Sequence, residues 1–98
     1  MAGLRRYANK RDASEPEIVA ALQDMGCSVE RMDKPVDLLV GYRGVTHLVE
    51  CKTAGTAYGK ELNANQKAFT EGWRGSQVVV LTCQDDAINF IQCMARAA

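Results

Sequence analysis

The order of hydrophobic and polar residues predicts a helix near the start of the chain. Between residues 14 and 25, Ile18, Leu22 and Met25 recur at the spacing of one helix face. Gly26 follows directly, and glycine is the residue that most often lies just past a helix C-terminus. The pattern therefore predicts a helix that ends at about Met25.

Three segments with the character of β-strands come next. Residues 27–32 carry a weak signal, whereas 36–42 and 45–52 are rich in Val and Leu, which favour strands. Residues 53–60 hold two glycines and few apolar side chains, which is typical of a loop. We therefore expect a hairpin followed by a loop in the middle of the chain.

The second half of the chain returns to helix and strand in turn. A helix is expected over about 63–74, and one stripe of this helix holds Leu62, Gln66, Phe69 and Trp73. The apolar run 78–82 suits a strand that is buried on both faces. A last helix is expected from Asp85 or Asp86 to Ala95, and its inward residues are Ile88, Ile91 and either Met94 or Ala95.

The order α-β-β-β-α-β-α predicts a mixed sheet with helices packed against it, in the α/β (mixed) or α+β class. The chain has 98 residues, no internal repeat and no dividing linker, so we expect a single domain over 1–98. Its composition is 47% hydrophobic and 24% charged, which is typical of a globular protein rather than a disordered one.

Several protein classes do not fit this sequence. No run of about 18 apolar residues is present, so no membrane span is expected, and the N-terminus lacks an apolar signal segment. We therefore expect a cytoplasmic protein whose four cysteines are reduced thiols. The cysteines form no C-x-x-C pair and the chain has one histidine, which argues against a structural zinc module.

The charges balance over the whole chain but not along it. Twelve basic and twelve acidic residues give a net charge of zero, yet residues 1–11 carry only basic charges. The basic residues of this arm are Arg5, Arg6, Lys10 and Arg11. Such an arm is either a solvated tail or a set of phosphate contacts, whose binding would weaken in salt.

The turn between the two strong strands determines how they pair. A two-residue turn at Arg43-Gly44 places Tyr42 opposite Val45. The same register places Asp37 directly opposite Glu50, on one face of the hairpin, with Cβ atoms about 4.5–5.5 Å apart. The sequence therefore predicts that two carboxylates meet at one end of the hairpin.

Lys52 lies two residues after Glu50 and therefore shares its face. Two adjacent carboxylates are unfavourable unless a cation neutralises them, and Mg²⁺ takes such oxygen ligands together with waters and phosphate oxygens. Such an ion can activate a water for attack on a phosphodiester, and Lys52 would hold that water or stabilise the transition state. The alternative is a structural ion pair between Glu50 and Lys52.

Glu15 falls on the same helical stripe as Ile18 and Leu22, so its carboxylate is expected on the buried face of the first helix. A structural explanation is also available, because Ser14 and Glu17 fit a capping box with Ser14 as the N-cap.

Gln66 interrupts the apolar stripe of the second helix, although Asn63 and Gln66 also resemble a capping box. A polar side chain on a buried face needs a partner. One polar site shared by Glu15, Gln66 and the hairpin charges would satisfy all of them.

Asp37 followed by Glu50-Cys51-Lys52 resembles the signature of the PD-(D/E)XK nucleases, in which an acid and an E-x-K triplet lie on adjacent strands. The element order is also similar to the restriction-endonuclease-like α-β-β-β-α-β core of that superfamily. Over about residues 10–91 the chain looks most like VRR-Nuc (virus-type replication-repair nuclease) domains, found alone in phages and related to archaeal Holliday-junction resolvases. Where the family has Pro-Asp, this chain has Pro35-Val36-Asp37, with one residue inserted.

The resemblance implies roles for the matching residues. Asp37 and Glu50 resemble the metal ligands, with the Cys51 backbone carbonyl as a third, and Lys52 resembles the catalytic lysine. The implied ion is Mg²⁺, for which Mn²⁺ would substitute.

Two helical residues also match the family. Glu15 is similar to the first-helix glutamate and Gln66 to the glutamine of the helix that follows the E-x-K strand. The resemblance implies a DNA endonuclease of phage or bacterial origin that resolves Holliday junctions. It also implies a homodimer, which suits a two-fold symmetric four-way junction.

Other candidates have simpler interpretations. Tyr58 and Lys60 in the glycine-containing loop would either contact a DNA backbone or form a solvated loop. His47 falls on the face opposite Glu50 and is expected in the core or on the surface, and Phe69 and Trp73 are expected in the core. The Cys51 thiol faces away from the acids, so no nucleophilic thiol is proposed.

Three alternative functions remain open on these residues. The first is a flap or end-processing nuclease of the same fold. The second is a DNA-binding module without activity, and the third is an unrelated small α/β interaction domain in which the E-x-K triplet is a coincidence.

Overall fold

The computed structural model describes residues 13–53 and 64–97, and within them three helices and four strands follow the expected order. The helices are α2 (Glu15–Asp24), α3 (Ala64–Gly72) and α4 (Gln84–Ala97). The strands are β1 (Ser28–Arg31), β2 (Leu38–Tyr42), β3 (Val45–Cys51) and β4 (Val79–Leu81). The prediction of a mixed α/β fold is confirmed.

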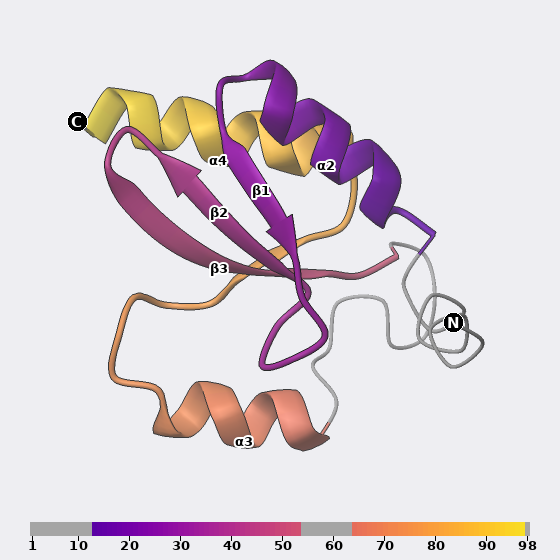
Figure 1. Cartoon of the computed structure of the whole chain (residues 1–98), viewed down its shortest axis with the longest axis vertical. Helices are drawn as coiled ribbons and strands as arrows, with labels where there is room; N and C mark the ends of the chain where they lie inside the picture. The colour runs from indigo at the N-terminus through magenta and orange to yellow at the C-terminus, as the bar shows by residue number, and fades with distance from the viewer. Residues whose placement is uncertain (1–12, 54–63, 98) are drawn as a thin grey trace.

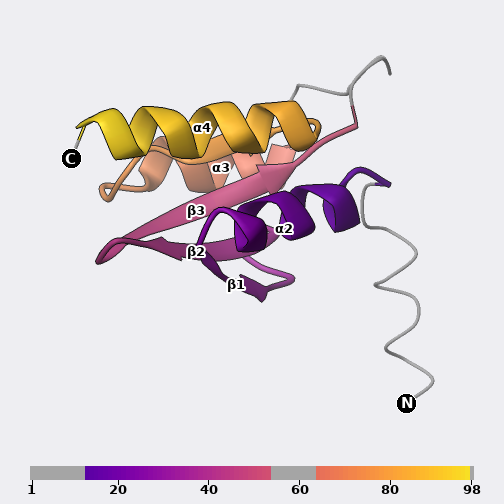
Figure 2. The same cartoon turned by 90° about the horizontal axis from the view of Figure 1, so that it is seen from above.

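The sheet is mixed, with strand order β1-β2-β3-β4. The β1–β2 and β2–β3 pairs are antiparallel, and β4 runs parallel to β3. Helices α2 and α4 lie on one side of the sheet and α3 lies on the other (Figure 1). Seen from above in Figure 2, α2 lies in front of the strands and α3 lies behind α4 and β3. The chain from β3 to β4 therefore passes α3 across the far side of the sheet.

The position of β4 differs from the sequence expectation. It is a three-residue strand at the edge of the sheet, and Val79 and Val80 are only half-buried. The prediction of a strand buried on both faces is therefore wrong. An apolar run shows that a strand is hydrophobic, but it does not give the place of that strand in the sheet.

The β2–β3 hairpin has the predicted two-residue turn. Arg43 and Gly44 have φ values of 49° and 83°, and two consecutive positive φ values define a type I′ turn. Tyr42 pairs with Val45 and Leu38 pairs with Val49. The predicted register is therefore confirmed for every pair of the ladder.

The hydrophobic core lies between the sheet and the layer formed by α2 and α4. Its strand residues are Leu38, Val40, Val49 and Cys51, each with no exposed surface. They pack with Ile18 and Leu22 of α2 and with Ile91 of α4. Burying one such aliphatic side chain contributes about 1.5–3 kcal/mol, so this side of the sheet carries most of the stabilisation. Side chains of the other parity point to the α3 side.

His47 lies on the face of β3 opposite Glu50, as predicted, and this face is the core side of the sheet. The histidine is 8% exposed, and its ring packs edge-on against Phe90 of α4 with ring centroids 5.1 Å apart. Trp73, in contrast, is 44% exposed, so its predicted place in the core is wrong. The reason is that α3 ends at Gly72, before Trp73, and lies across the sheet from the core. Within residues 13–53 and 64–97, no helix is long and apolar enough to cross a membrane.

Candidate active site and metal centre

A cavity of about 460 Å³ opens on the α3 side of the sheet. Three segments line it: the loop before β2, the end of β3 and the inner face of α3. The lining residues are Asp33, Lys34, Pro35, Asp37, Glu50, Gln66 and Phe69. The structure thus brings Asp37, Glu50 and Gln66 together in one cavity, although they are up to 29 positions apart in sequence.

Asp37 lies one residue before β2 and is half-buried. Its Oδ2 atom accepts a hydrogen bond of 2.8 Å from the backbone N–H of Cys51, at the end of β3. Its backbone carbonyl accepts a second bond of 2.7 Å from the N–H of Met32. Because both the backbone and the carboxylate are held, Asp37 has a defined orientation even though the β2 ladder begins at Leu38.

Glu50 is 1% exposed, and its Oε1 atom accepts a hydrogen bond of 2.7 Å from Nε2 of Gln66. A hydrogen bond to a charged group is among the stronger ones in proteins, at about 1.5–3 kcal/mol. Gln66 is therefore the residue that joins α3 to the acid of β3. The position of Gln66 on an apolar stripe predicted a polar partner, and Glu50 is that partner.

Glu15 opens α2 and is 1% exposed, on the buried face as expected. Its Oε2 atom lies 3.3 Å from Nε of Arg31 on β1, whose side chain is 52% exposed. The partial exposure of Arg31 means that this ion pair is only partly removed from water. Sequence reasoning missed Arg31 because the weak β1 segment gave no register against α2.

The Cys51 thiol lies close to the carboxylates of Glu15 and Asp37. One carboxylate oxygen of Glu15, one of Asp37 and Sγ of Cys51 all lie within 4.8 Å of one another. Cys51 has no exposed surface and points to the α2 side of the sheet. Asp37 thus takes part in two groups, one with Glu50 and Gln66 and one with Glu15 and Cys51.

The proximity of this thiol was missed in the sequence analysis. The alternation of β3 correctly puts the Cys51 and Glu50 side chains on opposite faces. However, Glu15 projects from the buried face of α2 toward the same side as Cys51. This shared direction was the signal that could have placed the thiol beside an acid.

Lys52 is not among the described residues that line the cavity. Its N–H donates to the carbonyl of Leu81 at 2.9 Å, and its own carbonyl accepts a bond of 2.9 Å from the Ser14 hydroxyl. The Lys52 backbone therefore connects β3 to β4 and to the start of α2. Whether its ammonium group serves the cavity stays a prediction.

The capping-box interpretation of Ser14 and Glu17 is wrong. Ser14 is the N-cap residue of α2 but makes no capping bond with its side chain, because its hydroxyl donates to Lys52 instead. Glu17 accepts a hydrogen bond of 2.9 Å from the N–H of Gln84, the first residue of α4. Both side chains thus connect α2 to other elements rather than satisfying its own N-terminus.

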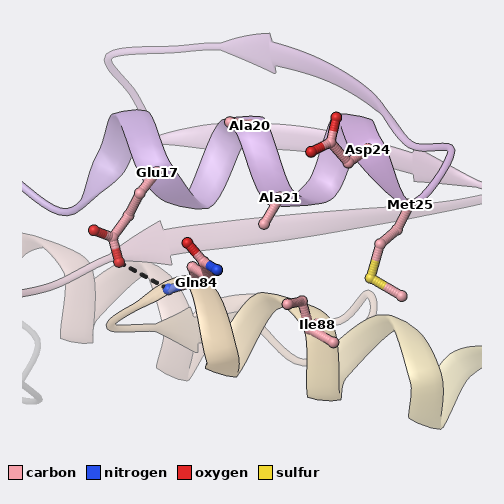
Figure 3. Close-up of a pocket in the computed structure, with 7 residues that line it drawn as sticks. All are labelled: Glu17, Ala20, Ala21, Asp24, Met25, Gln84 and Ile88. Carbon is pink, nitrogen blue, oxygen red and sulfur yellow. Dashed lines mark hydrogen bonds between the residues drawn. The ribbon is translucent and has the colours of Figure 1, made fainter.

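A second cavity, of about 440 Å³, lies in the groove between α2 and α4. Figure 3 shows Glu17 reaching across this groove to Gln84, with Asp24 at the end of α2, Met25 just beyond it and Ile88 on α4. None of the predicted site residues lines it. The groove therefore lies apart from the Asp37–Glu50 cavity and offers no converging set of reactive groups.

The remaining predicted site residues lie outside the described part of the chain. They are the arm residues Arg5, Arg6, Lys10 and Arg11 and the loop residues Tyr58 and Lys60. Their proposed contacts with DNA stay predictions. Lys34, which was not considered in the sequence analysis, lines the cavity and supplies a cation there.

The chain was compared with protein-family models, with curated proteins and with solved structures, and none of them matches.

Proposed function

We propose that this protein is a metal-dependent nuclease that hydrolyses phosphodiester bonds in branched DNA, four-way junctions in particular. The observation that carries the proposal is the meeting of Asp37 and Glu50 in one cavity, with Gln66 bonded to Glu50. Two acids from neighbouring strand ends, in a cavity open to solvent, form a site for a cation and a phosphate. The resemblance of Asp37 and Glu50-Cys51-Lys52 to the PD-(D/E)XK signature also supports this proposal.

The residues of the cavity fit a divalent cation. Asp37 and Glu50 supply carboxylate oxygens, the ligands that Mg²⁺ and Mn²⁺ take in proteins. The carboxylate of Asp37 is oriented by the N–H of Cys51, and that of Glu50 by the amide of Gln66. We assign Asp37, Glu50 and the Cys51 carbonyl as ligands of Mg²⁺, which would lower the pKa of a bound water and offset charge on the phosphate.

The chain itself supplies the other functions. Lys34 in the cavity wall offers a cation for a substrate phosphate, since a lysine acts as a point charge toward phosphates. Lys52 is proposed to place its ammonium group near the attacked phosphate and stabilise the charge that develops there. Glu15, which shares the 4.8 Å group with Asp37, is proposed to maintain the negative potential that attracts the cation.

The arm residues Arg5, Arg6, Lys10 and Arg11, with Tyr58 and Lys60, are proposed as contacts to the DNA backbone outside the cavity. Contacts of this kind release counterions, so binding would weaken with salt in proportion to their number. We further propose a homodimer, since two copies of one site suit the two equivalent strands of a junction.

Cleavage assays with labelled DNA test the proposal. Four-way junction, flap and linear duplex substrates would be incubated with the protein in Mg²⁺, in Mn²⁺ and in chelator. We expect metal-dependent cleavage by the wild type, and a loss of at least about 100-fold in Asp37→Asn, Glu50→Gln and Lys52→Ala, because each removes a charge that acts directly on the reaction. Asp24→Asn is the matched control, because Asp24 lines the other cavity.

The pattern of products distinguishes the alternatives. Paired symmetric nicks in the junction support a resolving enzyme, whereas single incisions near a flap indicate an end-processing nuclease. Equal cleavage by the wild type and Asp37→Asn contradicts the site. Binding without any cleavage in either metal contradicts the nuclease and favours a binding module.

A further inference from the structure

One aromatic side chain lines the Asp37–Glu50 cavity, and a second stacks against it. Phe69 of α3 lines the cavity, and Trp73 follows four positions later, just beyond the end of the helix. Their rings are stacked, with centroids 5.2 Å apart and an interplanar angle of 28°. Phe69 is half-buried, whereas Trp73 is 44% exposed. The aromatic surface therefore runs from the cavity wall out to solvent.

The exposed indole of Trp73 has two close neighbours in the chain. A Cβ atom at Gly75 would lie 2.7 Å from ring atoms Cε2, Cζ2 and Nε1, so the backbone at Gly75 passes close to the indole. The ring therefore contacts Phe69 on the helix and the backbone at Gly75 in the segment that follows.

The charges around these rings favour a nucleic acid strand as the ligand. Arg74 beside Trp73 is exposed, and Lys34 lies in the wall of the cavity itself. Exposed aromatic rings among cationic side chains are the arrangement with which proteins bind single strands: the rings stack on bases and the cations follow the phosphates. An apolar protein partner would not need this set of cations.

We propose that Phe69 and Trp73 form a stacking platform for an unpaired base of the strand whose phosphate enters the Asp37–Glu50 cavity. The inference rests on the proposed nuclease function and specifies its substrate as DNA with unstacked bases next to the cut. A base inside a duplex has both faces covered by its neighbours and cannot reach such a platform without unstacking. Junction centres, flaps and single strands present free base faces.

Trp73 itself provides the readout, because it is the only tryptophan in the chain. The wild type would be titrated in chelator, where metal-dependent cleavage cannot occur, with a single-stranded oligonucleotide and with a blunt hairpin duplex of the same composition. We expect saturable quenching of the tryptophan fluorescence by the single strand and little change with the duplex, because stacking changes the surroundings of the indole.

Substitutions identify the platform by affinity, measured with labelled oligonucleotides. Trp73→Ala is expected to weaken single-strand binding roughly 5- to 150-fold, and Trp73→Phe, which keeps an aromatic ring, is expected to restore most of it. Val45→Ala is the matched control, since Val45 is also an exposed apolar side chain but lies beside the hairpin turn. Circular dichroism of each variant verifies that it is folded.

The outcomes separate this inference from the nuclease proposal. Equal quenching by duplex and single strand, or unchanged affinity in Trp73→Ala, overturns the platform and leaves cleavage to be judged by Asp37→Asn alone. Selective quenching together with undiminished cleavage by Asp37→Asn supports the platform and contradicts the nuclease site. No quenching with either DNA overturns the inference, and the exposed rings are then better explained as a surface for a protein partner.

Discussion

At the scale of single residues, the costliest groups in this protein are its buried carboxylates. Glu15 and Glu50 are each 1% exposed in a domain of 98 residues. Removing a carboxylate from water costs several kcal/mol unless it is paired or hydrogen-bonded. Arg31 compensates Glu15 at 3.3 Å, and Gln66 compensates Glu50 at 2.7 Å. The positions of these partners therefore matter for stability and for the site.

The substitution Gln66→Leu measures the contribution of one partner. It removes the amide that donates to Glu50, so the buried carboxylate loses one hydrogen bond. We therefore expect the free energy of unfolding to fall by about 1–3 kcal/mol. Urea denaturation provides the measurement. Gln92→Leu is the matched control, because Gln92 lies exposed on α4, and it is expected to change stability by less than about 0.5 kcal/mol.

A double-mutant cycle makes the Gln66 test specific. In the background of Glu50→Gln the acceptor has lost its charge, so Gln66→Leu should cost distinctly less there than in the wild type. Identical costs in both backgrounds would show that Gln66 stabilises the protein through packing of α3 and not through Glu50.

His47 makes stability depend on pH. Burial lowers the pKa of its imidazole from the ordinary value of 6.5, so the folded protein favours the neutral form. The unfolded chain then binds the proton more tightly, and stability contributed by the neutral ring is complete above pH 6.5 and is lost as the pH falls through the folded pKa. His47→Leu should flatten this part of the pH profile of unfolding.

The measurement is direct, because His47 is the only histidine in the chain. Nuclear magnetic resonance of its ring protons gives the folded pKa, and the difference between wild-type and His47→Leu denaturation curves isolates its effect from that of the carboxylates. A folded pKa at or above 6.5 would contradict the burial argument.

At the scale of elements, the sequence pattern predicted the features that depend on residues close together in the chain. The hairpin register followed from the turn, since two residues with positive φ leave one way to pair the strands. The stripe of α2 and the face of His47 followed from helix and strand periodicity. The edge position of β4 and the exposure of Trp73 did not follow, because periodicity gives the face of a residue within its element and not the layer that covers it.

The turn of the hairpin provides a test at this scale. Gly44 has φ of 83°, a conformation that a residue with a Cβ adopts at a cost of roughly 1–2 kcal/mol. We expect Gly44→Ala to destabilise the protein by about that amount in urea denaturation. The control is Gly72→Ala at the end of α3, where a Cβ meets nothing within 4 Å and alanine is the better helix former by up to about 1 kcal/mol.

The same turn is also connected to the site. The register places the start of β2 beside the end of β3, at the far end of the hairpin from the turn. Strain in the turn should therefore lower stability without removing DNA cleavage under conditions where the protein is folded. A loss of cleavage by folded Gly44→Ala as large as that of Asp37→Asn would mean that the turn, and not the acid pair, sets the activity.

At the scale of the whole molecule, Asp37 connects the two sides of the sheet. The alternation of β3 sends Glu50 to the α3 side and the Cys51 side chain to the α2 side, and sequence reasoning placed the site on one side only. Asp37 lies one residue before its strand, so strand alternation does not constrain its carboxylate. It lines the cavity with Glu50 and also lies within 4.8 Å of the Glu15 and Cys51 ligand atoms.

This arrangement predicts that a divalent cation stabilises the fold. The acids come from α2, from the loop before β2 and from β3, so they are close together only in the folded chain, and an ion that binds them favours folding. At a free ion concentration of 100 times the Kd, the gain is about 2.7 kcal/mol. In a domain of this size, each kcal/mol raises the Tm by roughly 4–8 °C.

Thermal unfolding in Mg²⁺, in Mn²⁺ and in chelator measures that gain. We expect the wild type and Asp24→Asn to melt at higher temperature in either ion, and Asp37→Asn to melt at the same temperature with and without it. Glu50→Gln reports on the α3 side, and Cys51→Ser separates out the thiol, which should matter for a soft ion such as Cd²⁺ and not for Mg²⁺. A stabilisation that persists in Asp37→Asn would show that the ion binds elsewhere, since Asp37 is the residue that both acidic groups share.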